Sequence, residues 1–243
     1  MPKRMRQQRA GKGTPLFRAP SFRYKYKSRY RNFDDNEKMG KIVGKVVDII
    51  NDTARTAPIM IVEYSTGEQS ITPAPYGIKV GDIIESGAKA MVKTGNILPL
   101  KNIPAGTRIF NVELVPGDGG KLVRSSGSAA RIVSHEEGKV VIKLPSKTFK
   151  ILNSNCRATI GLTAGFGRKE KPIVKAGKNF HIKKSRGKYW PRVSGVAMNA
   201  VNHPFGGKRR STQSSKKKVA SRNAPPGRKV GSIAAKRTGR KKR

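Results

Sequence analysis

The acidic residues of this 243-residue chain are confined to its middle, and this partition constrains the fold more than any other feature. Residues 1–33 contain 11 Lys and Arg, residues 171–243 contain 23, and neither segment contains Asp or Glu. Residues 34–170 contain 19 Lys and Arg and all 14 acids. Like charges repel, and the flanks have too little apolar surface to offset the entropy lost on ordering. We therefore expect a folded middle and two extensions that order only when a polyanion neutralises them.

The formal net charge of +39 indicates the kind of partner. If about ten cations met phosphates of a duplex, log Kobs against log salt would have a slope of about −9. Nucleic acid is the polyanion that this asymmetry favours. An anionic membrane surface is a weaker alternative because no amphipathic helix of the required kind is predicted. The remaining alternative is that both ends are solvated and bind nothing. It is disfavoured because the positive charge of the flanks would then have no counter-charge.

Several function classes are excluded by missing motifs. No apolar run approaches the ~18 residues of a membrane span, and the first residues lack the apolar stretch of a signal peptide. The single Cys156 excludes a disulfide framework and a Cys-rich zinc site, and His135, His181 and His203 do not cluster with it. There is no phosphate-loop motif and no His-Glu-x-x-His metal helix. We expect an intracellular protein that is not an enzyme and has no cofactor, no protein-held metal and no small-molecule substrate.

Six of the chain's aromatic residues alternate with cations near the N-terminus, and they are Phe17, Phe22, Tyr24, Tyr26, Tyr30 and Phe33. Aromatic faces stack on unpaired bases or on guanidinium planes, while the cations meet phosphates. The alternative is that some rings only attach the extension to the first domain. We expect a mixture of both roles, which the sequence does not divide ring by ring.

The middle of the chain is predicted to be β-rich. Short runs of β-branched residues, separated by turn residues, predict strands at 42–50, 57–64, 68–72, 83–85, 107–114, 129–134, 139–144 and 147–152. Many short, evenly spaced strands favour closed antiparallel barrels, and this length suits two. The stretch 95–106 is the expected boundary between the two barrels. The predicted parts are an extension over 1–36, barrels over 37–100 and 101–165, and an extension over 166–243, in which only 233–237 suggests a helical turn.

Two glycine-containing segments stand out. Gly117-Asp118-Gly119-Gly120, before Lys121, either exposes backbone N–H groups to a phosphate or forms a turn between strands, and both alternatives stay open. Residues 195–207 are uncharged amid a basic background. Gly206-Gly207 permits close backbone approach, and Pro204 restricts the preceding His203 to extended geometry. This second segment is therefore predicted to fit one particular site.

Several long motifs in colinear order resemble the family of the universal large-subunit ribosomal protein two. They are residues 195–207, Cys156-Arg157-Ala158-Thr159-Ile160-Gly161, residues 120–127 and residues 96–104. Residues 225–231 and 234–240 resemble the archaeal and eukaryotic branch, and the compact length favours an archaeal source. The resemblance covers almost the whole chain.

The resemblance implies more than the composition does. It implies an OB-fold domain followed by an SH3-like barrel, with extensions that penetrate ribosomal RNA. It also implies binding to large-subunit ribosomal RNA near the peptidyl-transferase region, subunit association, tRNA binding and support of peptide-bond formation. Neighbouring ribosomal proteins and the small subunit would be further partners, RNA-held magnesium would lie at contacts, and the location would be the cytoplasmic ribosome.

In the family, the histidine matching His203 was once discussed in connection with peptide-bond formation. A histidine of ordinary pKa, about 6.5, acts as a general base when a reacting amine lies within reach. Here, however, Asn202 stands where relatives often have an acid, Ala200 where Pro is usual and Lys208 where a third Gly is common. No group supports acid–base chemistry, so we predict no catalytic residue. We expect His203 to fix the shape of its loop by hydrogen bonding to RNA or to the loop itself.

The candidate RNA-binding residues are cations for phosphate contact, together with aromatic and loop side chains for bases. They are Arg4, Arg6, Arg9, Lys12, Arg18, Arg23, Tyr24, Lys25, Tyr26, Lys27, Arg29, Arg31, Lys121, Arg124, Arg157, Arg168, Lys169, Lys183, Lys184, Arg186, Trp190, Arg192, Asn199, His203, Lys208, Arg209, Arg210, Arg228, Lys229, Lys236, Arg237 and Arg240.

Two other function classes remain as alternatives. A DNA-compacting chromatin protein would use the same electrostatics, although the sequence shows no dimerisation or groove-inserting element. An RNA-modifying enzyme with basic tails would need a cofactor or an acid–base site. Competition between structured ribosomal RNA and duplex DNA at matched salt distinguishes a chromatin protein from a ribosomal protein, since equal affinity would favour the chromatin protein. Turnover by the isolated protein would support an RNA-modifying enzyme.

Overall fold

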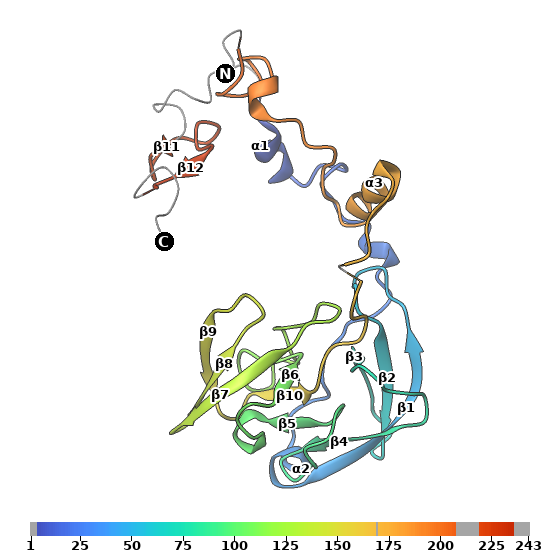
Figure 1. Cartoon of the computed structure of the whole chain (residues 1–243). Helices are drawn as coiled ribbons and strands as arrows, with labels where there is room; N and C mark the ends of the chain where they lie inside the picture. The colour runs from blue at the N-terminus through green and yellow to red at the C-terminus, as the bar shows by residue number, and fades with distance from the viewer. Residues whose placement is uncertain (1–3, 169, 208–218, 236–243) are drawn as a thin grey trace. The chain divides into compact units, whose positions relative to one another are not determined.

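The structure is a computed structural model that describes residues 4–168, 170–207 and 219–235. Its contacts divide the chain into two compact units. We call Ser21–Pro172 the β body, since it holds the large sheet (Figure 1). Met1–Pro20 and Ile173–Arg243 together form the second, which we call the terminal unit. The second half of the predicted N-terminal extension thus belongs to the β body.

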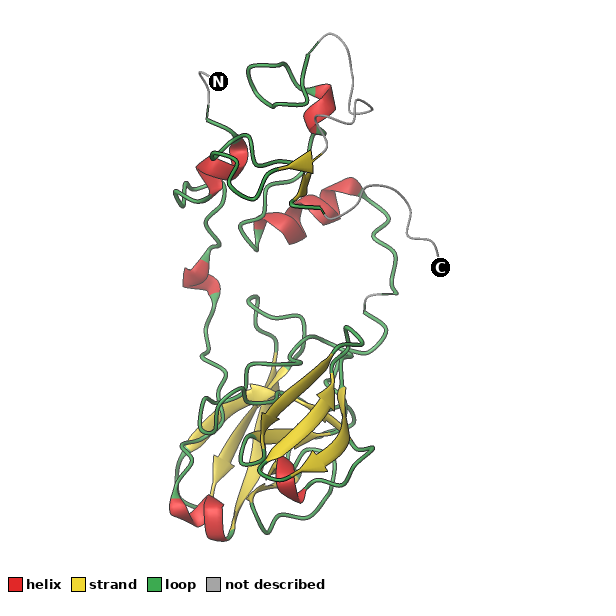
Figure 2. Ribbon diagram, turned by 90° about the vertical axis from the view of Figure 1, so that its left-hand side faces the viewer, coloured by secondary structure: helices red, strands yellow, loops and turns green. Residues whose placement is uncertain are grey.

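The β body is built mainly of short strands (Figure 2). In chain order its elements are η1 (Ser21–Arg23), α2 (Asp35–Met39), β1 (Lys41–Ile50), β2 (Ile59–Tyr64), β3 (Gln69–Pro73), β4 (Ile83–Gly87), β5 (Ile97–Pro99), η2 (Leu100–Asn102), β6 (Arg108–Phe110), β7 (Ala130–Glu136), β8 (Lys139–Lys143), β9 (Phe149–Asn153) and β10 (Arg157–Ile160).

These strands form one continuous sheet in the order β3-β2-β1-β4-β5-β10-β6-β7-β8-β9. Neighbours are antiparallel except β4 and β5, which run parallel. β1 shows why such a sequence forms a half-buried strand: Ile42, Gly44 and Val46 face inward while the residues between them face solvent. The predicted mainly β class is therefore confirmed.

The sheet encloses two separate apolar cores. The first is built on β1 to β4 around Val46, Met60 and Ile84. The second is built on β5 to β10 around Leu98, Leu100, Ile109, Ile132 and Ile142. Two cores on one sheet correspond to the two β modules predicted. The predicted boundary between residues 100 and 101 falls inside η2, whose first residue is already part of the second core.

Most predicted strands occur with ends shifted by no more than two residues, and three features differ. The strand predicted at 107–114 ends at Phe110, because Asn111 has a φ of 50° and turns the chain. β5 and β10 were not predicted, since both are short and buried along their whole length and so show no alternation. They join the two modules by pairing with each other.

The terminal unit contains α1 (Arg6–Ala10), α3 (Ala176–Lys184), η3 (Gly195–Ala197), β11 (Val219–Ala220) and β12 (Ser232–Ile233). The helical turn predicted at 233–237 is wrong at its start, because Ile233 pairs in β12, and residues 236–237 lie outside the described residues. The helix α3 was not predicted. Its N-cap residue Lys175 makes no side-chain cap hydrogen bond, and none of its residues is buried.

The two ends of the chain contact each other within the terminal unit. The rings of Phe17 and Tyr189 have centroids 6.2 Å apart. Met5, Ala220 and Val230 are the buried apolar residues among the described residues of this unit. The unit as a whole has 28 Lys and Arg and no acid. Across the residues that the structure describes, no helix is long and apolar enough to cross a bilayer.

Candidate nucleic-acid interface

The N-terminal segment 23–31 lies along the β body as an extended strand-like arm. The Arg29 amide donates to Ile71 O at 2.9 Å and the Tyr30 amide to Gly119 O at 3.2 Å. Exposure alternates over residues 23–30, as expected when successive side chains point to opposite faces, and the arm ends at the buried Arg31. The exposed series is Arg23, Lys25, Lys27 and Arg29, and the inward series is Tyr24, Tyr26, Ser28 and Tyr30. The arm therefore presents a row of cations to solvent.

The rings of the arm divide between the two roles that the sequence left open. Tyr30 is buried, and its hydroxyl donates to Asn111 O at 2.7 Å and shares a 2.6 Å hydrogen bond with Thr159 Oγ1. Burial raises the pKa of Tyr30 well above its ordinary value, so the phenol stays protonated. Phe22 is instead 82% exposed, with the Arg23 guanidinium 5.4 Å from its ring centroid. Tyr30 attaches the arm to the β body, whereas the Phe22 ring, just before the arm, is exposed to solvent, and base stacking by this ring stays a prediction.

A buried ion cluster lies beneath the arm, centred on Arg157 at the start of β10. One guanidinium nitrogen of Arg157 lies 2.6 Å from Glu37 Oε2 and another lies 2.8 Å from Glu113 Oε1. The side chains of Arg157, Glu37 and Glu113 are 1%, 0% and 0% exposed. The same guanidinium also donates to the backbone carbonyl of Arg31 at 3.0 Å. Removing one member of such a cluster leaves an uncompensated buried charge.

Arg31 extends this cluster toward the surface. Its side chain is 2% exposed and forms ion pairs with Asp34 at 2.6 Å, Glu68 at 3.0 Å and Glu37 at 3.4 Å. The hydrogen bonds from Arg31 lower the pKa of Asp34. Arg31 and Arg157 were both predicted to bind RNA, and this assignment is corrected. Neither guanidinium has surface left for a phosphate, and both are saturated by carboxylates of the chain itself.

The glycine-rich segment 117–120 also binds an internal carboxylate. The amides of Gly117 and Gly119 donate to Glu113 at 3.2 and 3.0 Å, and that of Gly120 donates to Asp118 Oδ1 at 3.1 Å. Gly120 is required, since it has a φ of 84° and a Cβ there would overlap Asn111. Of the two alternatives left open, the structure favours the turn.

The two predicted cations beside this turn differ in exposure. Arg124 is half-buried and donates to Gly120 O at 3.0 Å and to Ser28 O at 2.9 Å, so it joins the turn to the arm. Burial lowers the pKa of Arg124. Lys121 is exposed and lies 3.4 Å from Asp118. Of these two cations, Lys121 is therefore the one whose charge is exposed to solvent, although it also pairs with Asp118.

The remaining candidates divide by position. Exposed in the structure are Arg4, Arg9, Lys12, Arg18, Arg168, Lys184, Arg186, Arg192, Asn199, Arg228 and Lys229. Half-buried are Lys183, Trp190 and His203. Arg6 lies in α1. Outside the described residues lie Lys169, Lys208, Arg209, Arg210, Lys236, Arg237 and Arg240.

The uncharged loop 195–207 is closed around His203. The amide of Phe205 donates to His203 Nδ1 at 3.0 Å, and the two rings lie edge to face with centroids 5.1 Å apart. A Cβ on Gly195 would overlap the imidazole, so only glycine permits this packing. Burial lowers the pKa of His203, which favours a neutral ring with an acceptor at Nδ1. The loop itself is thus one hydrogen-bonding partner of His203.

The electrostatic arrangement of the chain follows from these contacts. Eight of the 14 acids form ion pairs inside the β body, and the terminal unit has none. Within the described residues, no group of three His, Cys, Asp or Glu could hold a metal. Acids are concentrated in the β body, where the buried Glu37 and Glu113 pair with Arg157, while most other described cations are exposed, and this arrangement is that of a nucleic-acid-binding protein.

The chain belongs to the ribosomal protein L2 family. Residues 4–86 match the family model described as "Ribosomal Proteins L2, RNA binding N-terminal domain", and residues 93–225 match "Ribosomal Proteins L2, C-terminal domain". The expected OB-fold followed by an SH3-like barrel is consistent with these two domains and with the two cores.

Full-length relatives come from methanogenic archaea. The protein of Methanocaldococcus jannaschii named "Large ribosomal subunit protein uL2" is 53% identical over 242 residues, covering 100% of both chains. Proteins of the same name from Methanococcus vannielii and Methanococcus aeolicus are 51% and 50% identical over 241 residues, covering 99% of this chain and 100% of theirs. The archaeal type, which the compact length favours within the archaeal and eukaryotic branch, is confirmed by these relatives.

Proposed function

We propose that this protein is a structural constituent of the large ribosomal subunit that binds and stabilises large-subunit ribosomal RNA. The observation that carries the proposal is the partition of charge between the two units. The terminal unit has 28 cations and no acid, while the β body buries its central acids against its own arginines. The relatives named as large-subunit proteins, aligned over their whole length, support the same assignment.

The two units have different roles in RNA binding. The β body docks on folded RNA as a preformed surface, because its arm, modules and ion cluster are held by internal contacts. The terminal unit neutralises phosphates where RNA helices crowd together. Phosphate contacts supply affinity, and shape, ribose and base contacts supply discrimination. The protein acts by positioning RNA and is not an enzyme.

The loop 195–207 is the part of the chain assigned to the peptidyl-transferase region, with support for subunit association, tRNA binding and peptide-bond formation. The support for this finer assignment is the loop's resemblance to the family motif and its fixed shape around His203. Catalysis by His203 itself is not proposed, since the terminal unit contains no carboxylate to orient it. Neighbouring ribosomal proteins and the small subunit are the further partners in the cytoplasmic ribosome.

Cosedimentation tests the proposal. The purified full chain is mixed with large subunits that lack it, and the particles are pelleted after a high-salt wash. We expect the chain to remain in the large-subunit fraction and to restore peptide-bond formation. Loss of the chain at the same salt that releases it from duplex DNA would contradict the proposal. Gly195→Ala should retain sedimentation but reduce peptide-bond formation, because the added Cβ displaces His203.

A further inference from the structure

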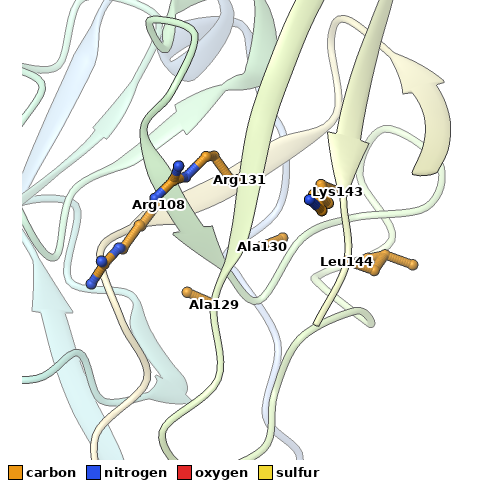
Figure 3. A pocket seen from close by; sticks show the side chains of 6 residues that line it. All are labelled: Arg108, Ala129, Ala130, Arg131, Lys143 and Leu144. Carbon is orange, nitrogen blue, oxygen red and sulfur yellow. The ribbon is translucent and has the colours of Figure 1, made fainter. Parts of the chain in front are cut away.

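Three cations lie side by side across the second β module. Arg108 on β6 pairs directly with Arg131 on β7, and Arg131 pairs directly with Lys143 on β8. Residues directly opposite each other in an antiparallel pair share one face of the sheet. All three side chains are exposed, and together with Ala129, Ala130 and Leu144 they line a surface hollow of about 270 Å³ (Figure 3).

This arrangement is unfavourable for the protein alone. Like charges directly opposite each other across strands destabilise a sheet. Three adjacent strands place the Cα atoms of the three residues within about 10 Å of one another, given a strand spacing of about 4.8 Å. None of the three forms an ion pair with an acid among the residues that the structure describes. The row thus differs from Arg31 and Arg157, which the protein neutralises itself.

An exposed aromatic ring continues the row. Phe149 on β9 pairs directly with Lys143, and the lysine Nζ lies 5.8 Å from its ring centroid. The Phe149 side chain is 63% exposed, and β9 is the last strand of the sheet. A flat, exposed ring beside cations is the combination on which unpaired bases stack while their phosphates are neutralised.

We propose that Arg108, Arg131 and Lys143 form a phosphate-binding site for the RNA backbone, with Phe149 as a stacking surface for an adjacent unpaired base. The proposal rests on the proposed function and specifies an RNA contact on the second module. RNA is favoured over a protein partner because three uncompensated cations in register require a closely spaced series of negative charges. A phosphodiester backbone supplies such a series.

The test compares two triple variants of the full chain. The site variant is Arg108→Gln, Arg131→Gln, Lys143→Gln, and the control is Lys79→Gln, Lys89→Gln, Lys101→Gln, which removes the same charge from other exposed positions of the β body. Binding to a large-subunit ribosomal RNA transcript is measured over a range of salt. Three lost phosphate contacts should reduce the magnitude of the log–log salt slope by about 2 to 3 and weaken binding at least roughly tenfold at low salt.

The outcomes separate this site from the general function. The site variant should bind more weakly than the control while unfolding at the same or higher urea concentration, because it relieves charge repulsion. Equal losses in the two variants would overturn the site, since only net charge would then matter. Unchanged RNA binding accompanied by loss of a neighbouring protein from the particle would overturn it in favour of a protein contact. If the unmodified chain failed to bind the transcript, the proposed function itself would fail.

A single substitution tests the aromatic part independently. Phe149→Leu removes the flat ring but keeps an apolar side chain and all charges. Affinity for the transcript should fall with no change in salt slope, because stacking releases no counterions. A changed slope, or unchanged affinity, would contradict a stacking role for Phe149.

Discussion

Arg157 and Glu113 form a buried ion pair with 2.8 Å between guanidinium nitrogen and carboxylate oxygen, in a protein with 53 Lys and Arg and only 14 acids. Glu113 also accepts hydrogen bonds from the glycine-rich turn, and Arg157 donates to the backbone of the arm. This pair therefore joins the arm, the turn and β10. The scarce acids stabilise the β body, and the cations that they leave unpaired are available for RNA.

Glu113→Gln should lower the free energy of unfolding by about 3 kcal/mol, because it leaves the Arg157 charge buried with only Glu37 opposite. Urea unfolding of the full chain measures the change. Lys38→Gln is the control, since its ion pair with Asp35 is exposed and should contribute less than about 1 kcal/mol. Equal effects of the two substitutions would contradict the structural role of the cluster.

The outward cations of the arm should affect binding and not stability. Replacing Lys25, Lys27 and Arg29 by Gln should weaken binding to ribosomal RNA and reduce the salt slope, with little change in urea unfolding. Tyr30→Phe should instead leave RNA binding nearly unchanged and lower the free energy of unfolding by about 1–2 kcal/mol. It removes the hydroxyl that hydrogen-bonds to Asn111 O and Thr159 Oγ1. If the triple variant unfolded more easily than Tyr30→Phe, the two faces of the arm would be wrongly assigned.

His203 should titrate below the ordinary histidine pKa of about 6.5, because burial in its loop disfavours the charged ring. Its contribution to loop stability is therefore present above the unfolded pKa and lost as pH falls through the lower folded pKa. Imidazole nitrogen chemical shifts followed by NMR measure this titration. Gly195→Ala should shift the pKa back toward its ordinary value by displacing the ring, and a raised pKa in the unmodified chain would refute the packing.

Cys156 should be unreactive in the folded protein, since burial raises the pKa of its thiol to about 11. Because the unfolded thiol ionises first, stability should decline as pH rises from about 9 toward 11. Alkylation at pH 8 should label the chain only after denaturant is added. Rapid labelling of the native protein would contradict this prediction, because it would show that the second core opens readily. In Cys156→Ala, the decline of stability between about pH 9 and 11 should be smaller, since the thiol no longer contributes to it.

Period-two patterns and composition predicted the mainly β class and most strands of the β body. Strands such as β1 alternate clearly and were predicted, whereas β5 and β10 are buried throughout and carry no alternation. The helix α2 was missed although Asp34 stands three residues before Glu37, a spacing typical of helix starts, and the amide of Glu37 donates to the Asp34 carboxylate. Local signals therefore specify single elements better than they specify how the two modules join.

The sequence predicts the kind of ligand, a polyanion, but not which individual cations are exposed to contact it. A cation has the same sequence signature whether it contacts RNA or an internal acid, so the sequence alone predicts an RNA contact for Arg157, whereas its guanidinium is paired with Glu37 and Glu113. Arg108 and Arg131, which we propose as phosphate ligands, could not be grouped from the sequence for the converse reason. They are 23 positions apart, and only the strand register places them opposite each other.

The central claim is that the outward cations serve large-subunit ribosomal RNA in particular. Competition between that RNA and duplex DNA for the full chain, at matched salt and nucleotide concentration, tests it most directly. We predict that the RNA displaces the DNA, that binding falls steeply with salt, and that the preference survives at the salt where DNA is released. Equal affinity for the two polymers at every salt concentration would contradict the account and favour a DNA-compacting protein.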